Sequence, residues 1–244
     1  MAKFSFVIPS LNEEVNLPVL LSSLASQTVK DFEVVVSDGK SEDKTKEEAL
    51  KFKDKLMLKF VESPKRKLTF QRNFGAKNAE GEYLIFLDSD YKTEEGFLKK
   101  ISDTLKKTNA DVIIPVSMPV TKDIFWKTYY WITNKIAFTT LILGQPFTVA
   151  SAICVRKELF DKIGGYDDSI FVYEDQYLFR QTFKLKAKIA YSKAKLYFSL
   201  RRNEKVGKIK FIYENLIATL HLIFKGPIKK EIYKYEMGGQ EFEK

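Results

Sequence analysis

Asp88 and Asp90 lie one residue apart, directly after the apolar run Tyr83–Leu87. Such a run predicts a buried strand, and residues that follow the strands of a parallel sheet lie at the sheet edge where ligands bind. Two carboxylates at that edge can bind a hard divalent cation together with substrate phosphates, and the cation would stabilise negative charge on a departing diphosphate. Because Asp is also common in turns, the pair indicates a metal site only together with other signals.

The choice of metal is limited by the chain's single cysteine, Cys154, and single histidine, His221. A zinc site with the usual ligands is therefore not expected, and oxygen ligands favour Mg²⁺ or Mn²⁺. Cys154 stands between two apolar residues, which is typical of a small core residue rather than a nucleophile. One cysteine also excludes an internal disulfide, which agrees with a reducing compartment.

Four further polar groups carry both a functional and a plain structural interpretation. Asp38 ends a predicted strand and could accept a hydrogen bond from a nucleobase, or simply belong to a turn. Residues 65–67 (Lys-Arg-Lys) could neutralise phosphate, or form a solvated basic loop. Asp175 opens a predicted helix, where it could act as a general base or merely favour the helix N-terminus. Arg202, in an Arg-Arg pair, could bind a diphosphate or lie on the surface.

The elements that must position these groups alternate between strand and helix. Strands are predicted at 4–8, 32–36, 56–61, 83–87 and 112–114, and helices are predicted to follow caps at Asn12, Thr69 and Thr93 and to span 43–53. This order predicts an α/β fold with a mostly parallel sheet covered on both faces. The loops 9–12, 37–39, 62–67 and 88–90 should then share one sheet edge.

The second half of the chain is less regular. Helices are predicted over 156–163, 174–183 and 209–224, and the last has an apolar stripe flanked by lysines. The aromatic-rich segment Ile124–Leu143 precedes them. Residues 136–155 carry no charge and are long enough to span a bilayer, but Gly144-Gln145-Pro146 interrupts the run, which argues against a spanning helix.

Several motifs, taken in order, resemble glycosyltransferase family 2. The segments that carry this resemblance are Val7–Glu14, Ser26–Thr28, Glu33–Asp43, Arg72–Ala76, Gly81–Asp90, Gly164–Asp167 and Glu174-Asp175. The resemblance extends from Phe4 to Arg202. It implies a GT-A fold over residues 1–205, an α/β architecture with a mostly parallel central sheet flanked by helices. The helical stripe of 209–224 predicts a helical C-terminal appendage over 206–244.

The resemblance also implies roles for individual residues in an inverting transfer from a nucleotide-diphosphate sugar. The residues expected to contact the nucleotide or its sugar are Pro9, Glu13, Asp38, Arg66, Lys67, Asp88 and Arg202. Asp90 would hold Mg²⁺ or Mn²⁺, and Asp175 would be the catalytic base that deprotonates an acceptor hydroxyl.

Two departures from the family pattern affect these roles. The frequent Asp-Asp-Gly-Ser motif is replaced by Ser37–Lys40, which loosens the assignment of the base-reading residue. The Gln-x-x-Arg-Trp motif of processive synthases is absent, since residues 176–180 do not match it. We therefore expect the transfer of a single sugar.

Two other functions remain as alternatives. A nucleotidyltransferase would also combine an α/β sheet, Mg²⁺ and a nucleotide, but it usually has a glycine-rich loop after the first strand, whereas residues 9–13 contain no glycine. A non-catalytic basic module for membrane or nucleic acid agrees with the net charge of +9, but the positive residues are scattered and no nucleic-acid motif is visible.

The expected partners are a nucleotide-diphosphate sugar donor and a glycan or lipid-linked acceptor, not nucleic acid. No signal-peptide pattern precedes the first strand, so a cytoplasmic location is expected. The apolar stripe of 209–224 leaves three alternatives: peripheral contact with the cytoplasmic face of a membrane, packing on its own domain, or a homodimer contact.

Overall fold

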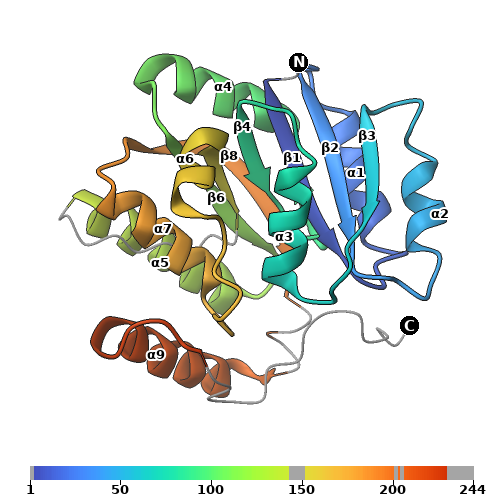
Figure 1. The fold of residues 1–244 in the computed structure, drawn as a ribbon. Helices are drawn as coiled ribbons and strands as arrows, with labels where there is room; N and C mark the ends of the chain where they lie inside the picture. The colour runs from blue at the N-terminus through green and yellow to red at the C-terminus, as the bar shows by residue number, and fades with distance from the viewer. Residues whose placement is uncertain (1–2, 143–151, 201–202, 204–205, 230–244) are drawn as a thin grey trace.

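The computed structural model describes residues 3–142, 152–200, 203 and 206–229 (Figure 1). Eight strands form one sheet in the order β3-β2-β1-β4-β7-β6-β8-β5. The strands are β1 (Phe4–Ser10), β2 (Phe32–Asp38), β3 (Leu58–Glu62), β4 (Tyr83–Phe86), β5 (Tyr91–Thr93), β6 (Val112–Val120), β7 (Ile153–Arg156) and β8 (Ile189–Ser199). The helices are α1 (Leu17–Ala25), α2 (Thr45–Leu50), α3 (Leu68–Lys77), α4 (Phe97–Thr108), α5 (Ile124–Ile142), α6 (Lys157–Ile163), α7 (Glu174–Lys184) and α9 (Lys208–Phe224).

Most of the sheet is parallel, as the sequence predicts. β1 pairs in parallel with β2 and β4, and β2 does so with β3. β7 runs antiparallel to both β4 and β6, so β6 again has the direction of β4, and β8 is parallel to β6. Only β7 and β5, which pairs antiparallel with β8, oppose the other six described strands.

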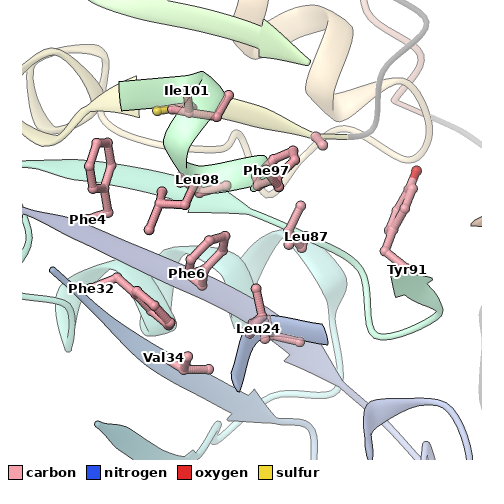
Figure 2. Packing of buried hydrophobic residues seen from close by; sticks show 14 of the residues in the cluster. Phe4, Phe6, Leu24, Phe32, Val34, Leu87, Tyr91, Phe97, Leu98 and Ile101 are labelled. Atoms are coloured by element: carbon pink, nitrogen blue, oxygen red, sulfur yellow. The ribbon is translucent and has the colours of Figure 1, made fainter. Parts of the chain in front are cut away.

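Helices cover both faces of the sheet because successive strand residues point to opposite sides. On one face, Phe4, Phe6 and Val34 pack beneath α1 and α4. Figure 2 shows Phe97 and Leu98 of α4 among these side chains. On the other face, the alternate residues of β1, β2 and β4, which are Val7, Val35, Leu84 and Phe86, pack with residues of α3, α6 and α7. Burial on both faces explains why these strands are apolar along their whole length.

The three predicted helix caps are wrong. Asn12 has a left-handed backbone and its side chain accepts a hydrogen bond from the Glu42 N–H, so α1 begins only at Leu17. Thr69 lies inside α3, which begins one residue earlier. Thr93 ends β5 instead of opening a helix, because its hydroxyl is hydrogen-bonded to the Ser23 hydroxyl of α1 at 3.0 Å. The side chains of Asn12 and Thr93 thus form hydrogen bonds to other elements instead of capping a helix.

β6 is longer than the sequence predicts. A strand ending at Ile114 was expected because Pro115 follows, yet β6 continues to Val120. The register against β8 shifts between Ile114 and Val116, so the proline lies at an irregularity where a missing N–H donor is tolerated. The strands β5, β7 and β8 were not predicted.

The C-terminal part of the structure packs on the sheet domain. Phe211 of α9 contacts Trp126 of α5, with ring centroids 5.2 Å apart, and Lys208 forms an ion pair with Asp123 at 2.6 Å. These contacts cross the predicted boundary between residues 205 and 206. No helix in the described part of the chain is long and apolar enough to cross a membrane. Of the uncharged run 136–155, residues 143–151 lie outside the described residues, and the last three belong to the central strand β7.

Candidate active site

Loops that follow the parallel strands meet at one edge of the sheet. Ser10 at the end of β1 is paired with Asp38 at the end of β2, which is paired in turn with Glu62 at the end of β3. The Ser89 hydroxyl, between the two predicted aspartates, donates a hydrogen bond to the Pro9 carbonyl at 2.7 Å. The four loops expected to share an edge therefore do so.

Arg72 is the central cation of this edge. It lies on α3 with a side chain that is 1% exposed, and its guanidinium contacts three carboxylates. One terminal nitrogen donates to Asp88 Oδ1 at 2.7 Å. The other donates to Glu174 Oε1 at 2.9 Å and to Asp175 Oδ1 at 3.1 Å. A single buried arginine thus connects the aspartate after β4 with the acidic pair that opens α7.

The loop before α7 is held against α3 by paired hydrogen bonds. The Asn73 side-chain amide donates to the Tyr166 carbonyl and accepts from the Tyr166 N–H, both at 2.8 Å. Gly165 has φ +75°, and a Cβ there would lie 2.5 Å from Asn73 Oδ1, so glycine is required by both conformation and space. The Gly-Gly-Tyr-Asp motif therefore has a structural reason: it lets Tyr166 approach α3 and Asp175.

Tyr166 supplies a further contact to the candidate base. Its hydroxyl donates a hydrogen bond to Asp175 Oδ1 at 2.8 Å. Its ring packs edge-on against Phe86, with centroids 5.1 Å apart, and the Arg72 guanidinium lies 5.1 Å from the ring centroid. The phenol is thus positioned by packing and pointed at the same carboxylate oxygen that contacts Arg72.

These surroundings shift the acidity of the three groups. Burial, together with the nearby charges of Glu174 and Asp88, raises the pKa of Asp175 to about 7, although Arg72 and the Tyr166 hydrogen bond act in the opposite direction. Burial, reinforced by Asp175, raises the pKa of Tyr166 well above its ordinary value. Burial disfavours charged Arg72, but Asp175 and Asp88 outweigh it and raise its pKa. Asp175 can therefore accept a proton near neutral pH, as a general base must.

The predicted nucleotide residues of the neighbouring loops are already engaged with protein groups. Asp38 is buried, and its carboxylate accepts hydrogen bonds from the Ser41 N–H at 2.8 Å and the Ser41 hydroxyl at 2.5 Å. Arg66 donates to the Lys40 carbonyl at 2.7 Å and pairs with Glu42. Asp38 therefore shapes its own loop, as its turn interpretation predicts, and each carboxylate oxygen has a second lone pair that can accept a hydrogen bond.

The remaining predicted residues are distributed around this edge. Lys67 reaches across to the Asp168 carbonyl, in the loop before α7. Glu13 accepts a hydrogen bond from the Asn16 side chain at 2.7 Å. Asp90 is exposed in the turn after β4. Arg202 lies outside the described residues.

Residues 5–164 match the family model described as glycosyl transferase family 2. The chain belongs to glycosyl transferase family 2. This match confirms the resemblance inferred from the motifs. The matched range includes those motifs as far as Gly164, the first glycine of the Gly-Gly-Tyr-Asp run.

Similarity to other family 2 proteins extends to sequence and structure. The chain is 36% identical over 118 residues to the poly(ribitol-phosphate) beta-N-acetylglucosaminyltransferase TarS of Staphylococcus aureus, and this match covers 47% of this chain and 21% of TarS. It is 25% identical over 217 residues to a cholesterol galactosyltransferase of Borreliella burgdorferi, covering 82% of this chain and 60% of the relative. The crystal structure of S. aureus TarS 1-349 in complex with UDP-GlcNAc has a TM-score of 0.70 at 26% identity, covering 90% of this chain and 66% of that one.

These matches confirm the predicted GT-A fold, since the sheet and its flanking helices follow TarS over most of the chain. The sequence matches cover about a fifth of the length of TarS and three fifths of that of the galactosyltransferase, and the structural match covers 40% of the crystallised TarS chain.

Three residues of the candidate site were not among the predicted site residues: Arg72, Asn73 and Tyr166. The sequence analysis used them only as parts of family motifs. A buried arginine inside a helix cannot be distinguished by sequence from an exposed one, and its partners Glu174 and Asp175 lie about 100 residues further along the chain. The available signal was that all three residues belong to the family motifs Arg72–Ala76 and Gly164–Asp167.

Proposed function

We propose that this family 2 domain transfers a single sugar from a nucleotide-diphosphate sugar to an acceptor hydroxyl, with Asp175 as the catalytic base. The observation that carries this proposal is the buried Arg72, which contacts both Asp88 on the donor side and Asp175. The UDP-GlcNAc complex of TarS supports a uridine-diphosphate sugar as the class of donor.

The proposed reaction is a direct displacement that inverts the anomeric centre. Asp175 takes the proton of the acceptor hydroxyl while that oxygen bonds to the anomeric carbon. The bond from this carbon to the diphosphate oxygen breaks, and the diphosphate leaves with the electron pair. Arg72 and Tyr166 keep the Asp175 carboxylate oriented, because both hold its Oδ1 atom.

We assign the donor to the loops at the ends of β1 to β4. Asp38 would bind the base beside Pro9 and Glu13, and Asp88 would face the ribose. Arg66 and Lys67, both in the loop between β3 and α3 and held by backbone carbonyls, would approach the base or the phosphates. Arg202 would add positive charge for the diphosphate.

In this donor arrangement, a divalent cation would be bound jointly by the protein and by the phosphates of the substrate. No group of three or more His, Cys, Asp or Glu side chains able to hold a metal occurs among the described residues. Mg²⁺ is commonly bound by one or two carboxylates plus substrate phosphates, and the exposed Asp90 can provide such a carboxylate. When bound, Mg²⁺ or Mn²⁺ would neutralise charge on the leaving diphosphate.

The acceptor is proposed to be a glycan or lipid-linked hydroxyl, since the relatives' names include a poly(ribitol-phosphate), a cholesterol and an undecaprenol-diphosphate acceptor. We propose that the enzyme works in the cytoplasm. The chain's one cysteine, Cys154, is a buried free thiol, which agrees with a reducing compartment.

Asp175→Asn tests the base. The substitution keeps the shape of the side chain and removes its basicity, so transfer should fall by about 10²–10⁴-fold while UDP-GlcNAc binding, measured by calorimetry, persists. Glu174→Gln is the matched control, because it removes a neighbouring carboxylate that contacts the same Arg72 nitrogen; it should retain most transfer. Loss of donor affinity with transfer intact at saturating donor would contradict the role.

Asp90→Ala tests the metal. Donor turnover should depend on Mg²⁺ or Mn²⁺ and should be lost in this variant, because the cation would keep only the phosphate oxygens as charged ligands. A panel of nucleotide sugars with each metal, read out as release of nucleoside diphosphate, measures this. Full activity in excess chelator would rule the metal out.

A further inference from the structure

The outer face of α9 exposes an unusual number of large apolar side chains. Its exposed apolar residues are Ile209, Ile212, Tyr213, Leu216, Ile217, Leu220 and Phe224. They recur every three or four positions, so they form one continuous stripe along the helix. Ile209 is 87% exposed and Phe224 is 79% exposed, which places the two ends of the stripe almost fully in solvent. We call these seven residues the α9 stripe.

The fold does not use the α9 stripe to pack the helix. The opposite side of α9 carries Ala218 and Leu222, which are buried, and Phe211, which packs on Trp126. Figure 1 shows α9 along the outside of the molecule, away from the sheet. The helix is therefore fixed by one face while the other remains available. Contiguous exposed apolar surface of this kind marks an interaction site.

The charges around the stripe indicate what binds it. Lys225 and Lys229 are exposed at the end of α9 or just beyond it, whereas Glu214, the only acidic residue of the helix, is paired with Lys210 at 3.9 Å. The whole chain carries a net charge of +9. A second copy would bring the same lysines face to face, so self-association through the stripe would meet like-charge repulsion. An anionic lipid surface accepts both the apolar stripe and the lysines.

We propose that the α9 stripe docks the enzyme on an anionic membrane surface. The helix would lie in the plane of the interface with the stripe among the acyl chains and the lysines at the headgroups.

This docking surface is joined directly to the helix that bears the candidate base. The Tyr173 hydroxyl donates to Asn215 of α9 at 2.6 Å, and Tyr173 immediately precedes α7. Phe171 donates its N–H to the Ile228 carbonyl, just after α9, at 2.8 Å. A docked α9 would therefore hold the start of α7 close to the membrane. This position suits a lipid-linked acceptor, a conclusion that rests on the proposed function.

Vesicle sedimentation with the full chain and no sugar donor tests docking independently of catalysis. The vesicles are phosphatidylcholine mixed with phosphatidylglycerol, and phosphatidylcholine alone. The test variant is Leu216→Glu with Leu220→Glu, both at exposed positions, so folding should be retained and is checked by circular dichroism. The matched control is Val19→Glu with Met57→Glu, which adds the same charge at two exposed apolar residues, one in α1 and one directly before β3.

The wild-type chain should bind the anionic vesicles, and binding should weaken as salt rises and on the neutral vesicles. The test variant should bind about tenfold or more weakly, because two leucines leave the apolar face, while the control changes far less. Lys225→Gln with Lys229→Gln should lower binding to anionic vesicles only. The proposal is overturned if wild-type protein stays in the supernatant at low salt, if test and control variants bind alike, or if light scattering shows a dimer that only the test variant abolishes.

Discussion

Replacing Tyr166 by Phe isolates one interaction with the candidate base. The substitution removes only the hydroxyl that donates to Asp175 Oδ1 at 2.8 Å and leaves the ring that packs on Phe86 and Phe160. The hydrogen bond favours the charged carboxylate, so its loss should raise the pKa of Asp175 further above its present value of about 7.

The size of the effect follows from the strength of such a bond. A hydrogen bond to a charged group contributes about 1.5–3 kcal/mol, and a pKa unit corresponds to about 1.4 kcal/mol, so the shift should be about 1–2 units. At about pH 7 the deprotonated fraction would fall from roughly one half to roughly 1–10%, and kcat/KM should fall by roughly 5–50-fold. Because the carboxylate itself remains, activity should recover as the pH rises toward about 9.

The assay is the pH profile of kcat/KM, which reports groups of the free enzyme. Tyr83→Phe is the matched control: Tyr83 is also buried, its hydroxyl donates to the Ala110 carbonyl, and Arg156 lies over its ring, but it does not contact the site. The control should leave the profile in place. An unchanged midpoint in Tyr166→Phe, or an equal loss at every pH, would refute the reasoning.

Two further changes test the scaffold of the site. Arg72→Met leaves Glu174 and Asp175 without their cation, so chemical denaturation should show a loss of about 3–5 kcal/mol at about pH 8. The loss should be smaller at about pH 5, where Asp175, whose pKa is raised to about 7, is protonated. Equal losses at both pH values would contradict the charge argument. Gly165→Ala places a Cβ 2.5 Å from Asn73 Oδ1 at φ +75°, so the free energy of unfolding should fall by about 1–3 kcal/mol in the same denaturation assay. Gly164→Ala is the control, because it has a similar positive φ but no atom within 4 Å of the new Cβ, and it should destabilise less.

The sequence predicted the first four parallel strands and their shared edge because apolar runs and turn residues are local signals. It could not predict β5, β7 and β8, since these strands are defined by partners far along the chain. Thr93 shows the same limit: its residue type suggests a helix cap, but the hydroxyl is bound to Ser23 of another element. Asp88 and Asp175 were selected by motif, yet their connection through Arg72 depends on three-dimensional packing.

The Val172–Ile228 bridge and the Tyr173–Asn215 hydrogen bond join α9 and the residues just after it to the segment that precedes α7. Chimeras between family 2 members that exchange only the C-terminal helix would place a foreign surface against Val172 and Tyr173. A graft that also carries residues 171–173 preserves both sides of this contact. Residues 171–173 and 206–229 should therefore be exchanged together, along with Asp123 and Trp126, which contact Lys208 and Phe211, when such enzymes are recombined.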